Sequence, residues 1–373
     1  MKNKHFRMTN LGGPAGMESD LSDLESATAA SSVAGDLEWT ALDEEEGLDA
    51  TITIDNFSDQ IEQAQDKRIA TRMKAADNIF YLLKKTYASE TVEKWKLTLC
   101  EIIEKNLKRT PDEALRACTL VALLSLQLGV VLEEDLQVVL GSLRALCIDD
   151  AASETLRAAC AQTLGFCVFL SCEQLSTRVD SLQTLRNVWT QMRPANVQPA
   201  LFSSALLSWV LLLERCDANM ISQNISELQP KLCHFLEATS VDVRISAGEA
   251  LAILFELATE NIDEDFRFTN HEHLKIILGE LAIDSAKYRA KRDKKVQKFT
   301  FRQINDAIFC ESPPHSQIRF NKREVLDVDG CHAKLLYDTL CQLLKAKTKS
   351  LYLEKSLGRF LKSEKHSPSQ TTR

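Results

Sequence analysis

The segments RACTLVALLSLQLG (116–129) and RAACAQTLGFCVFL (157–170) decide the fold, because both place small or apolar residues along one face of a helix. Related segments recur along the chain. If the first residue of each is taken as an anchor, the spacings are 44, 41, 43, 44 and 45 residues for Arg72, Arg116, Arg157, Ala200, Arg244 and Arg289. The seventh residue after each anchor is apolar: Ile79, Leu123, Leu164, Leu207, Leu251 and Val296.

A second helix is predicted before each of these helices except the first. Periodic apolar segments occupy 97–107, 133–147, 178–192, 225–236 and 272–283. The residues Thr110-Pro111-Asp112-Glu113 have the pattern of a capping box, which marks a helix start. A helix pair that repeats at this period is typical of armadillo and HEAT units, and one pair cannot bury its own apolar face. We therefore predict an all-α fold, a curved armadillo/HEAT-like α-solenoid of about five to six helical repeats.

The composition also favours helices and an intracellular setting. The 373 residues are 45% hydrophobic and include only 12 Gly and 8 Pro, few for a turn-rich β fold. The 11 cysteines occur singly without a Cys-x-x-Cys pair, so we expect reduced core thiols rather than disulfides or a metal framework. We find no signal peptide and no uncharged apolar stretch long enough for a membrane span. The expected locations are the cytoplasm and the nucleus, with no membrane partner.

The N-terminal region is acidic and has no helical periodicity. No Lys or Arg occurs between Met8 and Gln60, so we predict a disordered tail. It could act as a solubilising segment, as a docking segment for a basic partner, or as an autoinhibitory strand that competes for the chain's own basic stretch. The predicted regions are an acidic tail at 1–58, helical repeats at 59–310, a C-terminal module at 311–362 and a polar tail at 363–373.

The C-terminal module differs from the repeats. Residues 317–320 and 323–328 alternate like two short strands around a turn, which predicts a β-hairpin. Two helices are predicted after it, at 331–345 and 350–361.

The stretch YRAKRDKKVQKFTFR (288–302) concentrates positive charge in a chain whose net charge is −8. In a helix, most of its basic residues would form one cationic stripe. The stretch falls in the sixth repeat, where we expect Val296 and Phe299 to pack and where Arg292 and Asp293 replace small or apolar residues. It should therefore end the stack, either as a polar cap alone or also as a binding surface. The predicted partner-binding residues are Lys287, Arg289, Lys291, Arg292, Lys294, Lys295, Lys298 and Arg302.

The sequence gives little support for catalysis. It contains neither a Gly-x-Ser-x-Gly motif nor a kinase signature set. His271-Glu272-His273 has the wrong spacing for two metal ligands on one helix face, so we interpret it as a solvated loop. We predict a protein that is not an enzyme, with no catalytic residue, no cofactor, no metal and no small-molecule substrate.

Three segments together resemble the interferon-related developmental regulator family. They are VDVRISAGEALAILFELA (241–258), HLKIILGELAIDSAKYRAKRDKKVQKFTFRQI (273–304) and IRFNKREVLDVDGCHAKLLYDTLCQLL (318–344). The resemblance implies an armadillo-type fold with a small C-terminal module and no catalytic activity. It also implies a role as a transcriptional co-regulator in nuclear deacetylase-containing complexes, and one branch of the family is associated with ribosome binding and translational silencing.

The chain departs from the family pattern at some positions. Cys331 stands where the family usually has tryptophan, and the family's basic C-terminal extension is longer than the segment ending at Arg373.

Two functions remain open from the sequence. The first is a non-enzymatic scaffold that acts in gene regulation as a transcriptional co-regulator within protein complexes such as a deacetylase-containing co-repressor. The alternative is a translational regulator that binds the ribosome or RNA through the basic helix 287–302.

Overall fold

The computed structural model describes residues 52–283, 291–319 and 325–343. The predicted acidic tail up to residue 51, the predicted helix at 350–361, and Lys287 and Arg289 lie outside these residues. The described elements are, in order, η2 (Ile54–Asn56), α2 (Phe57–Gln63), α3 (Ile69–Lys85), α4 (Ser89–Leu107), α5 (Pro111–Leu128), η3 (Gly129–Leu132), α6 (Glu133–Ile148), α7 (Glu154–Ser171), α8 (Leu175–Thr190), α9 (Pro199–Leu213), α10 (Ala218–Phe235), α11 (Val241–Asn261), α12 (His271–Ile283), α13 (Lys291–Phe309), β1 (His315–Arg319), β2 (Val325–Asp329) and α14 (Cys331–Leu343).

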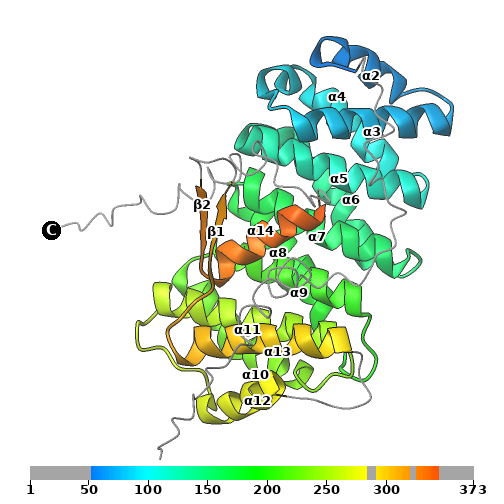
Figure 1. Ribbon diagram of the computed structural model, residues 1–373. Helices are drawn as coiled ribbons and strands as arrows, with labels where there is room; N and C mark the ends of the chain where they lie inside the picture. The colour runs from blue at the N-terminus through cyan, green and yellow to red at the C-terminus, as the bar shows by residue number, and fades with distance from the viewer. Residues whose placement is uncertain (1–51, 284–290, 320–324, 344–373) are drawn as a thin grey trace, which may run out of the picture.

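The helices pack in sequential pairs, and the pairs stack along one axis (Figure 1). Each even-numbered helix from α2 to α12 packs against the odd-numbered helix that follows it. The second helices of the pairs contact one another in chain order and form what we call the inner layer, made of α3, α5, α7, α9, α11 and α13. This arrangement confirms the predicted all-α helical-repeat fold.

Polar residues mark the starts of four helices. The side chains of Thr110, Ser153, Asp217 and Ser240 each accept a hydrogen bond from the backbone N–H three residues later. At the start of α5, the Glu113 carboxylate accepts a bond from the Thr110 hydroxyl at 2.9 Å. The same carboxylate also binds Arg72 in the preceding repeat, so this helix start joins two repeats.

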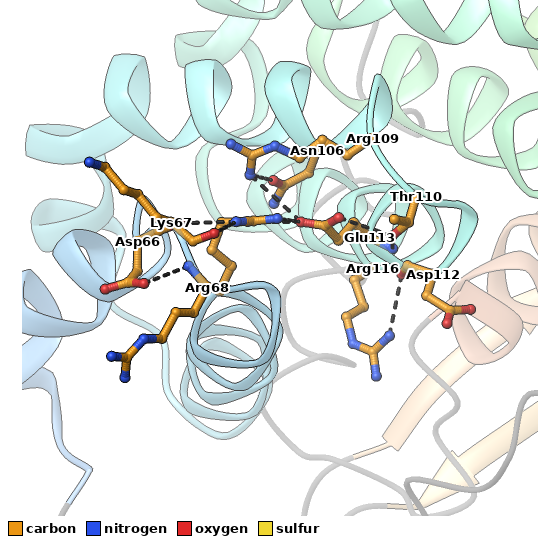
Figure 2. A network of polar contacts seen from close by, with 10 residues as sticks. Asp66, Lys67, Arg68, Asn106, Arg109, Thr110, Asp112, Glu113 and Arg116 are labelled. Carbon is orange, nitrogen blue, oxygen red and sulfur yellow. Dashed lines mark hydrogen bonds and ion pairs between the residues drawn. The ribbon is translucent and has the colours of Figure 1, made fainter.

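Two of the anchor arginines, Arg72 and Arg244, connect neighbouring repeats through buried polar contacts. Arg72 donates from Nε and Nη2 to Oε1 of Glu113, at 2.9 and 2.6 Å, and from Nη1 to the backbone carbonyls of Asp66 and Lys67. Figure 2 labels the three residues that accept these bonds. Arg244 similarly donates to the side chain of Gln297 in α13 at 2.6 Å. These arginines therefore have a structural role, because they donate hydrogen bonds to buried oxygen atoms between repeats, and buried polar groups need such partners.

One described stretch, Pro111–Ile148, is long and apolar enough to cross a membrane by length and composition alone. It comprises α5, η3 and α6, which pack against α4, α7 and α8 and contribute a large part of the core. A core helix of a stacked repeat protein has the same composition as a membrane span, because it is covered on most sides.

The sixth repeat packs in a different register from the predicted one. Val296 is partly buried and packs against the core as predicted, and Phe299 is half-buried, whereas Gln297, Phe301 and Ile304 are fully buried. The reason is a close contact with α11: a Cβ at Gly248 would lie 2.8 Å from both Phe301 Cε1 and Ile304 Cδ1. Because Gly248 has no side chain, Phe301 and Ile304 fit against it. Helix α13 is therefore rotated about its axis by one residue relative to the position predicted from the repeat pattern.

The C-terminal module folds back onto the repeats. Strands β1 and β2 pair antiparallel, with Ile318 opposite Leu326, which confirms the predicted hairpin at slightly different bounds. Helix α14 follows directly and packs on α7, α9 and α11 of the inner layer, where Figure 1 shows it crossing the middle of the stack. The surface that a solenoid offers to partners is therefore partly covered by its own C-terminal helix.

Candidate functional site

The predicted basic stripe lies on the last helix of the stack. Lys291 and Arg292 belong to the first turn of α13, and the helix continues to Phe309. Arg302 and Lys295 are exposed, while Lys294 and Lys298 are half-buried. The side chain of Phe301 packs against Gly248 of α11, so the helix presents these four cations on a fixed support.

The start of α13 lies beside the start of α11. Burial raises the pKa of Asp242 in the first turn of α11, and the nearby carboxylate of Asp293 raises it further. The basic face is therefore bordered by two acids, and its net charge near the N-terminus of α13 is lower than the basic residues alone suggest.

A second candidate site lies where α14 meets the inner layer. The carboxylate of Glu256 in α11 accepts hydrogen bonds from the backbone N–H groups of Cys331 and His332, at 2.6 and 3.3 Å. Unpaired N–H groups at a helix N-terminus favour a negative charge, so Glu256 caps α14 across the interface. Burial raises the pKa of Glu256 to about 7, although the bonds from α14 act in the opposite direction.

A charged cluster lies one turn further along α14. Lys334 Nζ is 2.8 Å from Asp338 Oδ2 and 4.0 Å from Glu249 Oε1 of α11. Burial alone would lower the pKa of Lys334, but the two carboxylates outweigh it and raise the pKa. Burial raises the pKa of Glu249 to about 7, with Lys334 lowering it and Asp338 raising it.

The first turn of α14 also contacts α9 and its C-terminal end. The imidazole of His332 lies against the carboxylate of Glu214 and is 3.4 Å from the carbonyl oxygen of Leu211. Its ring packs 5.5 Å from the ring of Phe169 in α7. Near the other end of α14, Gln162 of α7 donates to the side chain of Gln342. Polar contacts to three inner-layer helices thus hold α14 in place.

A cavity of about 60 Å³ remains between α14 and the inner layer. Its lining combines apolar side chains with a polar set made of three serines of α9, three glutamines and the charged cluster. The lining includes Gln162, Ser203, Ser204, Ser208, Glu249, Thr300, Gln303, Cys331, Lys334, Asp338, Thr339 and Gln342. The cavity could hold a polar group that carries several hydrogen-bond donors.

The residues of this second site are not among those predicted from the sequence. One signal was available: Glu249 and Glu256 are seven residues apart within the apolar helix SAGEALAILFELA (246–258), so they share one face. Two acids on the inward side of an apolar helix require partners, and those partners come from α14, about 80 residues later in the chain.

The described residues contain no group of three or more His, Cys, Asp or Glu side chains arranged to hold a metal ion. Cys118, Cys160 and Cys167 are buried, as expected for core thiols. Burial raises the pKa of the Cys167 thiol, which disfavours the reactive thiolate.

Comparison with known proteins identifies the family. The sequence matches the family model Interferon-related developmental regulator (IFRD) over residues 20–308. The chain belongs to this family. It is 33% identical to interferon-related developmental regulator 1 of Sus scrofa and 32% identical to that of Homo sapiens, each over 296 residues and 76% of the chain. Interferon-related developmental regulator 2 of Mus musculus is 32% identical over 294 residues, which cover 75% of the chain and 66% of that protein.

This IFRD chain spans 65% of the length of the Sus scrofa and Homo sapiens relatives that it matches. The names of these relatives describe regulators and state no catalytic activity. Among solved structures, an engineered protein aligns with a TM-score of 0.42 and 12% identity, covering 67% of this chain and 97% of that protein.

Proposed function

We propose that this IFRD-family protein is a non-enzymatic helical-repeat scaffold that regulates gene expression through protein–protein contacts, as a transcriptional co-regulator in the nucleus and cytoplasm. Its partner would be a protein complex such as a deacetylase-containing co-repressor. The observation that carries the proposal is the outward basic face of α13, where Lys294, Lys298 and Arg302 are displayed by a helix locked to the stack through Phe301. A rigid cationic face favours an acidic partner surface.

The same face supports one alternative function, binding of the ribosome or RNA. Several cations on one side of a helix can contact successive phosphates, and such contacts release counterions. The two functions differ in their partner and in their sensitivity to salt, so one set of variants can separate them.

The test uses the full chain with Lys294→Glu, Lys298→Glu and Arg302→Glu combined. A matched control reverses three exposed lysines at the other end of the stack, Lys67, Lys74 and Lys94, with the same change in net charge. Circular dichroism should show both proteins to be folded, because all six side chains lie outside the buried core.

The scaffold function predicts that the α13 variant loses co-precipitation of a histone deacetylase from nuclear extract, while the control variant retains it. Ribosome binding predicts instead that the native protein sediments with ribosomes in a sucrose gradient and that the α13 variant does not. Three phosphate contacts would give a slope of about −2 to −3 in log K against log salt. Unchanged deacetylase capture by a folded α13 variant would contradict the proposed use of this face.

A further inference from the structure

The cavity beneath α14 is a separate feature from the basic face of α13. Its volume of about 60 Å³ is several times the ~10–15 Å³ that one water molecule occupies on the same kind of measure. It therefore has room for a group of several non-hydrogen atoms. The lining includes side chains from α7, α9, α11, α13 and α14, so the cavity exists only when α14 is docked on the inner layer.

One wall of the cavity offers an unused hydrogen-bonding group. Ser203, Ser204 and Ser208 of α9 all line the cavity, and Ser203 is 1% exposed. Within the residues that the structure describes, the hydroxyl oxygen of Ser203 has no hydrogen-bond partner. A buried hydroxyl without a partner is destabilising unless a bound group or water satisfies it. The hydroxyl can accept a bond from a ligand donor.

The charge on the opposite wall is negative. Two carboxylates, Glu249 and Asp338, line the cavity together with one ammonium group, Lys334, and the other lining residues are neutral. Lys334 is close to Asp338 at 2.8 Å but is at 4.0 Å from Glu249, so its charge chiefly neutralises Asp338. Glu249, whose side chain is 17% exposed, is left with the weaker compensation. A second positive charge in the cavity would complete two ion pairs.

We propose that this cavity binds the cationic head of an arginine or lysine side chain from a partner protein, with Glu249 as the counter-charge and the Ser203 hydroxyl as an additional acceptor. A guanidinium or ammonium group carries several N–H donors and no acceptor, which matches a wall of carboxylate and hydroxyl oxygens. Burial raises the pKa of Glu249 and Lys334 offsets this only in part, so a second cation beside the carboxylate would favour its charged form.

Three probes test the charge and the source of the ligand. The n-propylguanidinium ion reproduces the end of an arginine side chain, and n-propylurea is its neutral analogue of similar shape. The blocked peptide acetyl-Gly-Arg-Gly-amide presents the same group from a polypeptide. Binding to the full chain would be followed by isothermal titration calorimetry and by NMR of methyl groups near the cavity.

Two cavity variants and one matched control complete the design. Glu249→Gln removes the charge with almost no change in volume, and Ser204→Leu fills the cavity without changing any charge. Glu264→Gln removes an exposed carboxylate in the turn between α11 and α12. Thermal unfolding would verify that all three variants remain folded.

The native chain and Glu264→Gln should bind n-propylguanidinium and the arginine peptide with similar affinities, and should bind n-propylurea at least ten times more weakly. Glu249→Gln and Ser204→Leu should each weaken binding of the cation at least tenfold. No binding of n-propylguanidinium, equal binding of the urea, or undiminished binding by both cavity variants would overturn the proposal. Binding of n-propylguanidinium without the peptide would overturn the assignment to a protein partner. None of these variants alters the basic face of α13, so the cavity and the proposed function can fail independently.

Discussion

The carboxylate of Glu256 in α11 accepts a 2.6 Å hydrogen bond from the backbone N–H of Cys331, 75 residues later in the chain. This contact sets the N-terminus of α14 over the inner layer of the solenoid. It places a negative charge where the helix has unpaired N–H groups, so it fixes both the position and the direction of α14.

Gly330 makes this contact possible, and replacing it should release α14. Gly330 has φ +97°, and a Cβ at this position would lie 2.2 Å from Glu256 Oε1. We expect Gly330→Ala to destabilise docking of α14 by about 1–3 kcal/mol, because strain and a steric clash add together. Hydrogen exchange of the α14 amides should accelerate at least fivefold.

The control for this change is Gly279→Ala in α12, where nothing lies within 4 Å of the added Cβ. It should leave exchange in α14 unchanged. Equal protection of α14 in the two variants would show that the Glu256 contact does not govern docking.

The buried pair of Arg72 and Glu113 should contribute strongly to stability at the N-terminal end. Arg72→Met would leave a carboxylate that is 2% exposed without its main partner, and loss of one member of a buried pair typically costs about 3–5 kcal/mol. Arg109 lies 3.6 Å from the same carboxylate and should reduce the loss to the lower end of that range. Urea unfolding measures the change.

Lys105→Met provides the comparison, because Lys105 pairs with Glu101 at 3.6 Å on the exposed surface. Lys105→Met should lower the free energy of unfolding by less than about 0.5 kcal/mol. If the two substitutions had similar effects, the anchor arginine would not be the structural connection that its geometry indicates.

Two helical glycines should respond to alanine in opposite directions. At Gly165 in α7, a Cβ would lie 2.4 Å from the Cβ of Ser208 in α9, so Gly165→Ala forces the helices apart and should cost about 1–3 kcal/mol. At Gly141 in α6, nothing lies within 4 Å, and Gly141→Ala should stabilise by about 0.5–1 kcal/mol through helix propensity. Thermal denaturation of the two variants shows whether each substitution raises or lowers the stability. Destabilisation of equal size in both would contradict the close approach of α7 and α9.

The titration of Glu249 should make stability depend on pH. The pKa of this carboxyl is about 7 in the folded chain, above its ordinary value of 4.5, so the folded state binds more protons between these values. The protonated Glu249 carboxyl therefore contributes fully to the free energy of unfolding below about pH 4.5. This contribution is lost as the pH rises towards 7. Glu249→Gln removes this loss.

The free energy of unfolding of Glu249→Gln relative to the native chain should accordingly rise by about 1–3 kcal/mol between pH 5 and pH 7.5. Glu256 and His332 are present in both proteins, so their contributions to the pH dependence largely cancel in the difference. A flat difference for Glu249→Gln would mean that its carboxyl titrates normally.

The sequence predicted most of the fold because helical periodicity is a local property. Apolar residues at fixed offsets from Arg72, Arg116 and Arg157 specify one face of each helix, and the period of the pattern specifies stacking. The alternation in β1 and β2 likewise predicted the hairpin. The basic residues of α13 were identified from charge alone, and their function remains a proposal.

The sequence by itself determined the pairing of helices, the period of the repeats and the position of the basic helix at the end of the stack. The tertiary structure decided how α13 is rotated about its axis. A shift of one residue turns a helix by about 100°, and the contact with Gly248 places Phe301 in the core. The tertiary structure also decided that α14 covers the inner layer and that Glu249 and Glu256 become buried partners of a distant helix. Those features depend on contacts between residues far apart in the chain, and no local pattern encodes which surfaces will meet.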